Sequence, residues 1–218
     1  MSEGPVIVID GSGSSLFCGI LDPTNGWRGQ TTLNGGPLEK LFPAVEQVLK
    51  ASELGLAELK GFYYCEGPGS VLGLRLCAMA IETWIRLFPE TSQLYAYNSL
   101  QLCAEVLLNQ GHEWNDALIV ADWKKGAWNG LKVSDRQPGK IDVYDDAAIQ
   151  DWQGPLYHLP QRKGWQAPPP QAETLSYDPA QLSQLPSLSR FLRKTDSVEL
   201  YSSGVNTFQK WTAERHRA

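Results

Sequence analysis

The sequence predicts an α/β fold in which helices pack on a mixed β-sheet. Short apolar runs rich in β-branched residues alternate with longer segments whose apolar residues recur at helical spacing. Apolar residues make up 42% and charged residues 20% of the 218 residues. That balance is normal for a globular chain with a substantial core, so we expect one compact unit or two small lobes.

Three predicted strands open the chain. Val6–Asp10 is a buried strand, because β-branched apolar residues lead up to an acid. Leu16–Leu21 and Trp27–Leu33 follow after turns rich in glycine, serine and asparagine, and they complete a meander. A helix then runs from Pro37 to Ala51, since proline suits the first helical position, where its missing N–H would be unpaired anyway.

Strands and helices continue to alternate up to residue 109. The predicted elements are the strands Gly61–Glu66 and Leu94–Tyr97 and the helices Val71–Phe88 and Ser99–Asn109. Three strands followed by helix, strand, helix, strand and helix is the order of a ribonuclease-H-like lobe, a mixed sheet with helices packed on it. We therefore assign residues 1–110 to such an N-terminal lobe.

The second half of the chain is less regular. It contains the predicted strands Ala117–Ala121, Gly126–Val133 and Lys140–Tyr144. Gly154–Gln171 carries many of the 14 prolines and is expected to be an extended surface segment. Residues 111–218 are predicted to form a smaller, irregular C-terminal lobe.

Charge and cysteine content exclude several classes of protein. The chain has 19 Lys and Arg against 24 Asp and Glu, a formal net charge of −5. Because nucleic-acid binding depends on cations that neutralise phosphates, we do not expect the chain to bind RNA alone. It has no signal peptide and no apolar run of the roughly 20 residues that span a bilayer, so a cytoplasmic protein without a membrane role is expected. Four cysteines are predicted to be reduced core thiols: Cys18, Cys65, Cys77 and Cys103.

The helix predicted over Val71–Phe88 is apolar around most of its circumference. Its polar residues are Arg75, Glu82, Thr83 and Arg86, and its small residues are Gly73, Cys77, Ala78 and Ala80. A helix on a sheet needs only one apolar stripe. Either the helix is covered on both sides by its own chain, or it lies in a subunit interface.

A tight turn, Gly67-Pro68-Gly69-Ser70, precedes that helix. The free N–H groups of a helix N-terminus can receive an anion. A phosphate-binding P-loop would also need the G-K-[ST] sequence, which is absent. The favoured interpretation is therefore a structural turn in which Ser70 is the N-cap of the helix.

A second Gly/Ser turn follows the first predicted strand. In actin-like ATPases such a hairpin wraps phosphates beside an acid, which makes Asp10, Gly11, Ser12 and Gly13 the candidate nucleotide-binding residues. Ordinary hairpin turns have the same composition, and we favour that simpler interpretation. No metal site is predicted, because the three histidines are far apart in the sequence. A cysteine hydrolase using Cys65 or Cys77 is the least favoured interpretation, since buried thiols are usually inert.

The segment GPGSVLGLR resembles the TsaB (YeaZ) family of tRNA threonylcarbamoyladenosine biosynthesis proteins. The family pattern G-P-G-S-[FY]-T-G-[LI]-R likewise follows a strand and opens an apolar helix. Val71 and Leu72 depart from it. The positions that match are Gly67, Pro68, Gly69, Ser70, Gly73, Leu74 and Arg75. Residues 6–22, residues 38–62 and Ala121–Trp128 also resemble family segments in the same order.

This resemblance implies a two-lobed fold of the actin-like ATPase (ASKHA) kind with a reduced second lobe. Family members, once labelled glycoprotease-like or peptidase M22-like, lack a working active site. They pair with the catalytic subunit TsaD, a nucleotide-binding ATPase called TsaE joins the complex, and they form homodimers in isolation. The resemblance therefore implies a non-catalytic partner that meets tRNA only through the complex. It implies no cofactor of its own, and leaves open ATP or ADP with magnesium at a shared interface.

The family pairs through the helices of its first lobe, which implies a dimer surface on Pro37–Ala51 and Val71–Phe88. We expect both apolar stripes to face outward. The predicted interface residues are Leu41, Val45, Gly73, Cys77, Ala80, Ile81 and Trp84. The alternative function is a degenerate phosphotransferase-like protein that holds a nucleotide at Asp10–Gly13.

Overall fold

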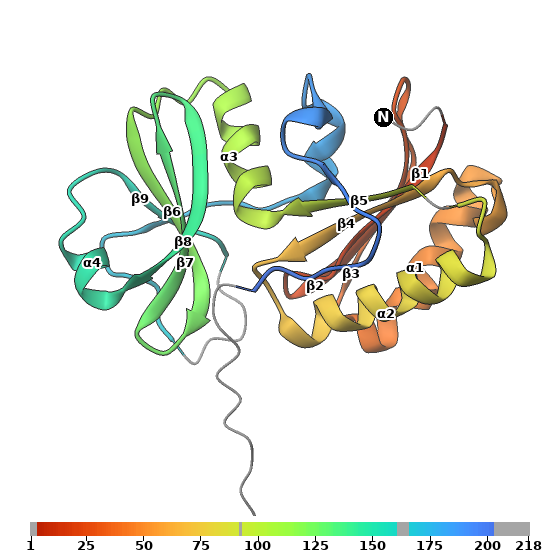
Figure 1. Ribbon diagram of the computed structural model, residues 1–218, viewed down its shortest axis with the longest axis horizontal. Helices are drawn as coiled ribbons and strands as arrows, with labels where there is room; N and C mark the ends of the chain where they lie inside the picture. The colour runs from red at the N-terminus through yellow and green to blue at the C-terminus, as the bar shows by residue number, and fades with distance from the viewer. Residues whose placement is uncertain (1–3, 92, 161–165, 203–218) are drawn as a thin grey trace, which may run out of the picture.

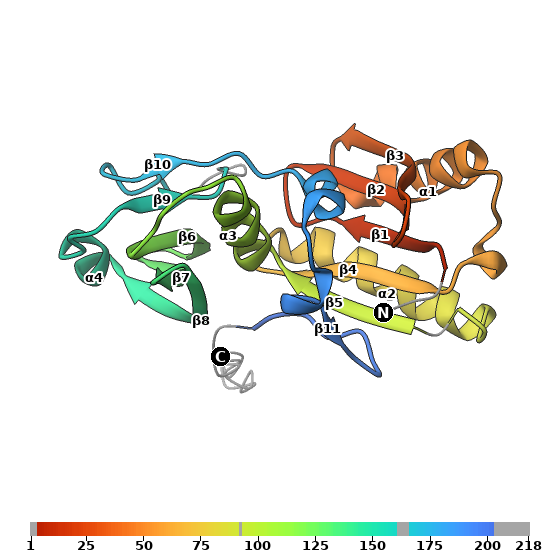
Figure 2. The ribbon, with the colours of Figure 1, turned by 90° about the horizontal axis from the view of Figure 1, so that it is seen from above.

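The computed structural model describes residues 4–91, 93–160 and 166–202, which form two sheets with a helix between them (Figures 1 and 2). The first sheet has the order β11-β5-β4-β1-β2-β3. Its strands are β1 (Val6–Asp10), β2 (Ser15–Asp22), β3 (Gly26–Asn34), β4 (Gly61–Gly67), β5 (Gln93–Asn98) and β11 (Arg193–Lys194). β1, β2 and β3 form an antiparallel meander, whereas β4 and β5 run parallel to β1, so the predicted mixed sheet is confirmed.

The second sheet has the order β10-β9-β6-β7-β8. Its strands are β6 (Asp116–Lys124), β7 (Ala127–Ser134), β8 (Gln137–Asp145), β9 (Leu156–His158) and β10 (Glu173–Thr174). β9 lies inside this sheet, parallel to β6, and its Leu156 and His158 are buried. The prediction that Gly154–Gln171 is a surface segment is therefore wrong over β9, although residues 161–165 lie outside the described part.

Helices cover both faces of the first sheet (Figure 1). The helices are α1 (Pro37–Ser52), α2 (Val71–Leu87), α3 (Ser99–Asn109) and α4 (Asp146–Gln150), with 3-10 turns η1 (Leu56–Glu58), η2 (Pro179–Gln184) and η3 (Leu188–Arg190). α1 and α2 pack side by side on one face, and α3, η2 and η3 pack on the other. α3 also packs on the second sheet, so it forms the core between the two lobes.

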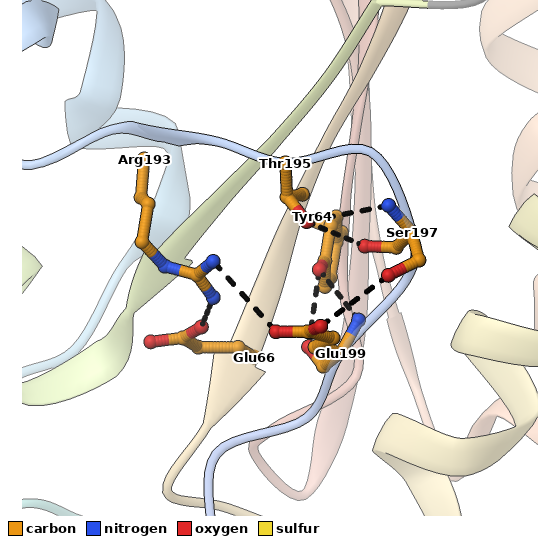
Figure 3. Close-up of polar contacts among 6 residues, drawn as sticks. All are labelled: Tyr64, Glu66, Arg193, Thr195, Ser197 and Glu199. Carbon is orange, nitrogen blue, oxygen red and sulfur yellow. Dashed lines mark hydrogen bonds and ion pairs between the residues drawn. The ribbon is translucent and has the colours of Figure 1, made fainter.

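The chain returns to the first lobe at its end. β11 pairs antiparallel with β5, so the prediction that all of residues 111–218 form a separate lobe is wrong. Figure 3 shows how the strap of residues 193–201 is held: Arg193 pairs with Glu66 at 2.7 Å, and the Tyr64 hydroxyl bonds both the N–H and the C=O of Glu199 at 3.0 Å. Residues 203–218 lie outside the described structure.

No helix in the described ranges is long and apolar enough to cross a membrane.

Candidate functional site

The carboxylate of Asp10, at the end of β1, is used completely by its own chain. Oδ1 accepts hydrogen bonds from the backbone N–H of Ser12 at 2.8 Å and from its hydroxyl at 2.6 Å. Oδ2 accepts hydrogen bonds from the hydroxyls of Tyr97 at 2.7 Å and Tyr177 at 2.6 Å. Asp10 is only 2% exposed. Four donors therefore occupy the positions that a metal ion or a water would need.

The two tyrosines hold their protons firmly. Burial, and next the charge of Asp10, raise the pKa of Tyr97 and of Tyr177 well above the ordinary value of 10.0. Both hydroxyls therefore stay donors at neutral pH. The sequence predicts neither contact, because Tyr97 ends a short apolar strand and Tyr177 lies in an irregular segment with no local signal.

The glycines of the hairpin serve close packing. A Cβ on Gly11 would lie 2.8 Å from Cys77 Sγ, and a Cβ on Gly73 would lie 2.4 Å from the carbonyl oxygen of Gly11. Backbone of the hairpin and backbone of α2 are thus in direct contact. Gly13 differs, because a Cβ there would meet nothing nearer than 3.8 Å. Of the candidate nucleotide residues, Asp10, Gly11 and Ser12 are buried by the chain itself, and Gly13 is half-buried.

The two Gly/Ser turns meet in space. Ser70 N–H donates to the carbonyl oxygen of Ser12 at 2.7 Å, and a Cβ on Gly69 would lie 2.5 Å from Ser12 Cβ. Ser99 Oγ donates to the carbonyl oxygen of Pro68 at 2.7 Å. The Ser70 side chain accepts from Gly73 N–H at 3.3 Å, so its predicted role as N-cap is confirmed.

Most of the predicted interface residues face the chain's own core. All are buried except Ala80, which is half-buried. Leu41, Val45, Cys77, Ile81 and Trp84 belong to the core between α1, α2 and the first sheet. The expectation that both stripes face outward is therefore wrong, because the chain's own sheet and hairpin cover the side of each helix that carries Val45, Gly73, Cys77 and Ile81.

A different apolar stripe of α2 faces outward. Leu72, Leu76, Met79, Thr83 and Leu87 recur at helical spacing on the side opposite the buried residues. The side chains of Leu72, Met79 and Leu87 are 65%, 64% and 65% exposed. Beside them on α1, Leu38 is 73% and Phe42 66% exposed. We call these seven residues of α1 and α2 the outer face.

A groove of about 260 Å³ runs between the two helices on this outer face. Leu38, Phe42, Leu76, Met79 and Thr83 line it together with Pro37, Leu41, Ala80 and Trp84. The Phe42 ring stands edge-on to Trp84 with centroids 6.0 Å apart. Three of the predicted interface residues, Leu41, Ala80 and Trp84, therefore border the groove from below.

The four cysteines are free and buried, as predicted. Burial raises the pKa of Cys77 and of Cys103 to about 12, with the Asp10 charge adding to the shift at Cys77. Burial also raises the pKa of Cys18 and of Cys65 above the ordinary value of 9.0. All four are thiols at neutral pH, the form that is a poor nucleophile.

A histidine–carboxylate pair lies between the lobes. His158 Nε2 is 3.3 Å from Asp122 Oδ1, and His158 is 1% exposed. Both line a cavity of about 380 Å³ with Ser12, Ser14 and Ser15 of the hairpin. Sequence analysis does not predict the pair, because 36 residues separate its members and the resemblance of Ala121–Trp128 to a family segment gives Asp122 no partner. Within the described ranges, no three His, Cys, Asp or Glu residues are placed to hold a metal ion.

Comparison with known sequences finds only short matches. No protein-family model matches the chain. The uncharacterized protein MG208 of Mycoplasma genitalium is 37% identical over 57 residues, which cover 26% of this chain and 29% of that protein. Its homologue in Mycoplasma pneumoniae is 34% identical over 76 residues, covering 33% and 38%. The matches thus span well under half of these relatives.

Comparison with solved structures identifies the fold. YeaZ from Pseudomonas aeruginosa superposes with a TM-score of 0.56 at 13% identity, covering 72% of this chain and 75% of that one. A second structure, described as an uncharacterized protein with similarity to peptidase YeaZ from the same organism, gives the same values. The predicted α/β fold, a mixed sheet with helices packed on it, is confirmed, and the chain has a TsaB-like (YeaZ-like) fold.

Proposed function

We propose that this chain is a non-catalytic partner subunit, which pairs through its outer face with a TsaD-like subunit of the machinery that makes threonylcarbamoyladenosine in tRNA. The YeaZ-like fold supports the choice of partner. The outer face supports the role, and it is the observation that carries the proposal.

The outer face has the properties of an interface core. Its five most exposed apolar residues come from two adjacent helices, and three of them, Leu38, Phe42 and Met79, line the groove of about 260 Å³. Exposed apolar side chains that gather in one patch mark protein-binding surfaces, whereas scattered ones do not. Charged residues are depleted at the cores of such interfaces, as they are along this stripe of α2.

The rest of the chain supports a role without its own chemistry. Asp10 is closed off by four hydrogen bonds, so the hairpin offers no free carboxylate to a magnesium nucleotide. A net charge of −5 favours tRNA contact through another subunit. A TsaE-like ATPase would join the complex as a third member, and ATP or ADP would bind only at a shared interface. Without its partner, the chain would pair with a second copy through the same face.

The decisive experiment is co-expression with the TsaD homologue of the same organism, followed by size-exclusion chromatography with mass determination. We expect a one-to-one complex that replaces the homodimer. A chain that stays a homodimer, or a monomer, beside that homologue would overturn the proposed role and leave only the fold.

A further inference from the structure

A second cleft between the lobes lies beside the start of α2. It measures about 800 Å³. The first lobe contributes Gly13 and Ser14 of the hairpin, residues 68–71 and Arg75. The second lobe contributes Asp122, Trp123 and Asn129. Tyr201, at the end of the strap, lines it as well. Clefts of this size between lobes commonly hold small molecules.

The start of α2 carries two unused donors, one of them on Val71, which lines this cleft. Gly73 N–H is bonded to the Ser70 side chain and Leu74 N–H to the Ser70 carbonyl. The N–H groups of Val71 and Leu72 precede them and have no acceptor among the described residues. The turn before them is fixed by its bonds to Ser12 and Ser99. A rigid pair of free N–H groups at the positive end of a 17-residue helix favours an anion.

Arg75 adds a full positive charge. It lies one turn after Val71, lines the same cleft and is exposed. It forms no ion pair or hydrogen bond with any described residue. An unpaired guanidinium beside free backbone N–H groups suits a phosphate or a carboxylate, which it can bind through two parallel hydrogen bonds.

Asn129 supplies an independent sign of a ligand on the opposite wall. It is 3% exposed, yet its Oδ1 has no donor anywhere in the described structure. On β7 it shares a face with Leu131 and Val133, which pack toward α3, so it points toward the first lobe. A buried acceptor without a donor destabilises the folded chain, so such groups are usually satisfied by something bound.

We propose that this cleft binds a small molecule that carries an oxyanion group and, at its other end, an N–H or O–H donor. The oxyanion, a phosphate or a carboxylate, accepts hydrogen bonds from Val71 N–H, Leu72 N–H and Arg75. The donor reaches Asn129 Oδ1 and the side of the cleft that carries Asp122. The cleft borders the Asp10 hairpin, whose Gly13 and Ser14 line it, but the ligand would not use the Asp10 carboxylate. Binding of a small molecule there goes beyond the proposed partner role.

The opposite polarity of the two walls selects the class of ligand. A simple anion would leave Asn129 without a donor and would lie near the Asp122 carboxylate. A simple amine would find no acceptor at α2 and would meet the Arg75 charge. Only a molecule with both groups satisfies both walls.

The test is titration of the isolated, isotope-labelled chain, followed by nuclear magnetic resonance. Four probes are used. Phosphoethanolamine carries a phosphate and an amine, and β-alanine carries a carboxylate and an amine. Inorganic phosphate supplies the anion alone, and ethanolamine supplies the amine alone. We expect phosphoethanolamine or β-alanine to shift the backbone amides of Val71 and Leu72 and the side-chain amide of Asn129. Whichever of these two probes binds more tightly identifies the oxyanion as a phosphate or a carboxylate. Inorganic phosphate should move the α2 amides alone, and ethanolamine neither set.

Two substitutions on one helix make the test specific. Arg75→Gln should weaken binding roughly tenfold or more, the effect of losing a charged hydrogen bond. Arg86→Gln, the matched control, removes an exposed arginine three turns further along α2, outside the cleft, and should leave binding unchanged. The proposal is overturned if no probe gives a saturable shift at Val71 and Leu72 up to about 20 mM, or if both variants bind alike. If phosphoethanolamine and β-alanine bind no more tightly than inorganic phosphate, the assignment of a ligand donor to Asn129 is wrong. None of these results depends on a partner subunit.

Discussion

The hydroxyl of Tyr177 donates a hydrogen bond of 2.6 Å to the carboxylate of Asp10, 167 residues earlier in the chain. Asp10 ends the first strand of the first sheet, and Tyr177 lies where the chain returns from the second lobe. The bond therefore ties the two ends of the fold together. It also occupies the acid that an actin-like nucleotide site would need, so one contact has a structural consequence and a functional one.

Removing this contact should destabilise the protein. Tyr177→Phe leaves one oxygen of a buried carboxylate with one donor fewer, and we expect a loss of about 1–3 kcal/mol in the free energy of unfolding. Urea denaturation measures it. Tyr63→Phe is the matched control, because Tyr63 is fully buried and its hydroxyl has no partner among the described residues. That change should be neutral or stabilising. Equal losses in both variants would show that the packing of the buried hydroxyl group, and not its bond to Asp10, is measured.

The isolated chain should not be stabilised by nucleotide. Because Asp10 has no free oxygen, we expect no thermal shift with ATP and magnesium. A ligand present at about 100 times its dissociation constant would add about 2.7 kcal/mol of stability, which is easily seen. A clear, magnesium-dependent shift would favour the phosphotransferase-like alternative, and it would require the Tyr97 and Tyr177 hydroxyls to move away from Asp10.

The outer face should control assembly. Met79→Glu places a charge in the middle of the exposed stripe of α2, where a partner would have to bury it. We expect loss of pairing, measured as mass by light scattering, with an unchanged circular dichroism spectrum. Val143→Glu is the control, because Val143 is an exposed apolar residue (40%) on β8 of the second sheet. Assembly that survives Met79→Glu would place the interface elsewhere.

Local sequence patterns predicted where the helices and strands lie, but they did not predict which side of α2 faces outward. The runs of β-branched residues in β1, the proline at the start of α1 and the serine cap of α2 are local signals, and the structure has each in its place. α2, however, carries two opposite apolar stripes, one through Ile81 and one through Met79. Periodicity shows that both exist, but it does not say which one the sheet covers. Small residues such as Cys77 proved to be contacts with the hairpin of the same chain.

The residues of the site that were missed share a physical cause. Tyr177 meets Asp10, and His158 meets Asp122, only because the second lobe folds back on the first. Such contacts depend on topology, and nothing in the surrounding sequence signals them. The same is true of β9, which pairs with β6 because the chain returns past that strand. The prolines around β9 instead favoured an extended surface segment.

The cysteines should be unreactive in the folded protein. All four are buried, and the pKa of each is raised, so both access and the thiolate form are lacking. We expect no reaction with a thiol reagent such as dithiobis-nitrobenzoate under native conditions, and four reactive groups in denaturant. One fast thiol in the native protein would contradict this and would reopen the cysteine hydrolase interpretation, first at Cys65 or Cys77.

Acid should weaken the turn between β2 and β3 through one carboxylate. Hydrogen bonds from Arg28, at 2.8 Å, and then from Thr24 lower the pKa of Asp22 well below its ordinary value of 3.8. A lowered pKa means that the folded state binds the proton less well than the unfolded state. The stabilisation is therefore complete above the ordinary pKa and is lost as the pH falls toward the lowered one.

Urea denaturation of the wild type and of Asp22→Asn at about pH 6 and about pH 3 tests this. The variant should be less stable at the higher pH, and the gap should narrow at the lower pH, because the wild-type carboxylate is then partly protonated in the unfolded state. Arg28→Gln should also be less stable than the wild type at about pH 6, and this difference should likewise narrow at about pH 3, because Arg28 is the largest cause of the lowered pKa of Asp22. A gap that is constant with pH would mean that Asp22 stabilises the turn by its shape and its neutral hydrogen bonds to Thr24, and that its charge contributes nothing.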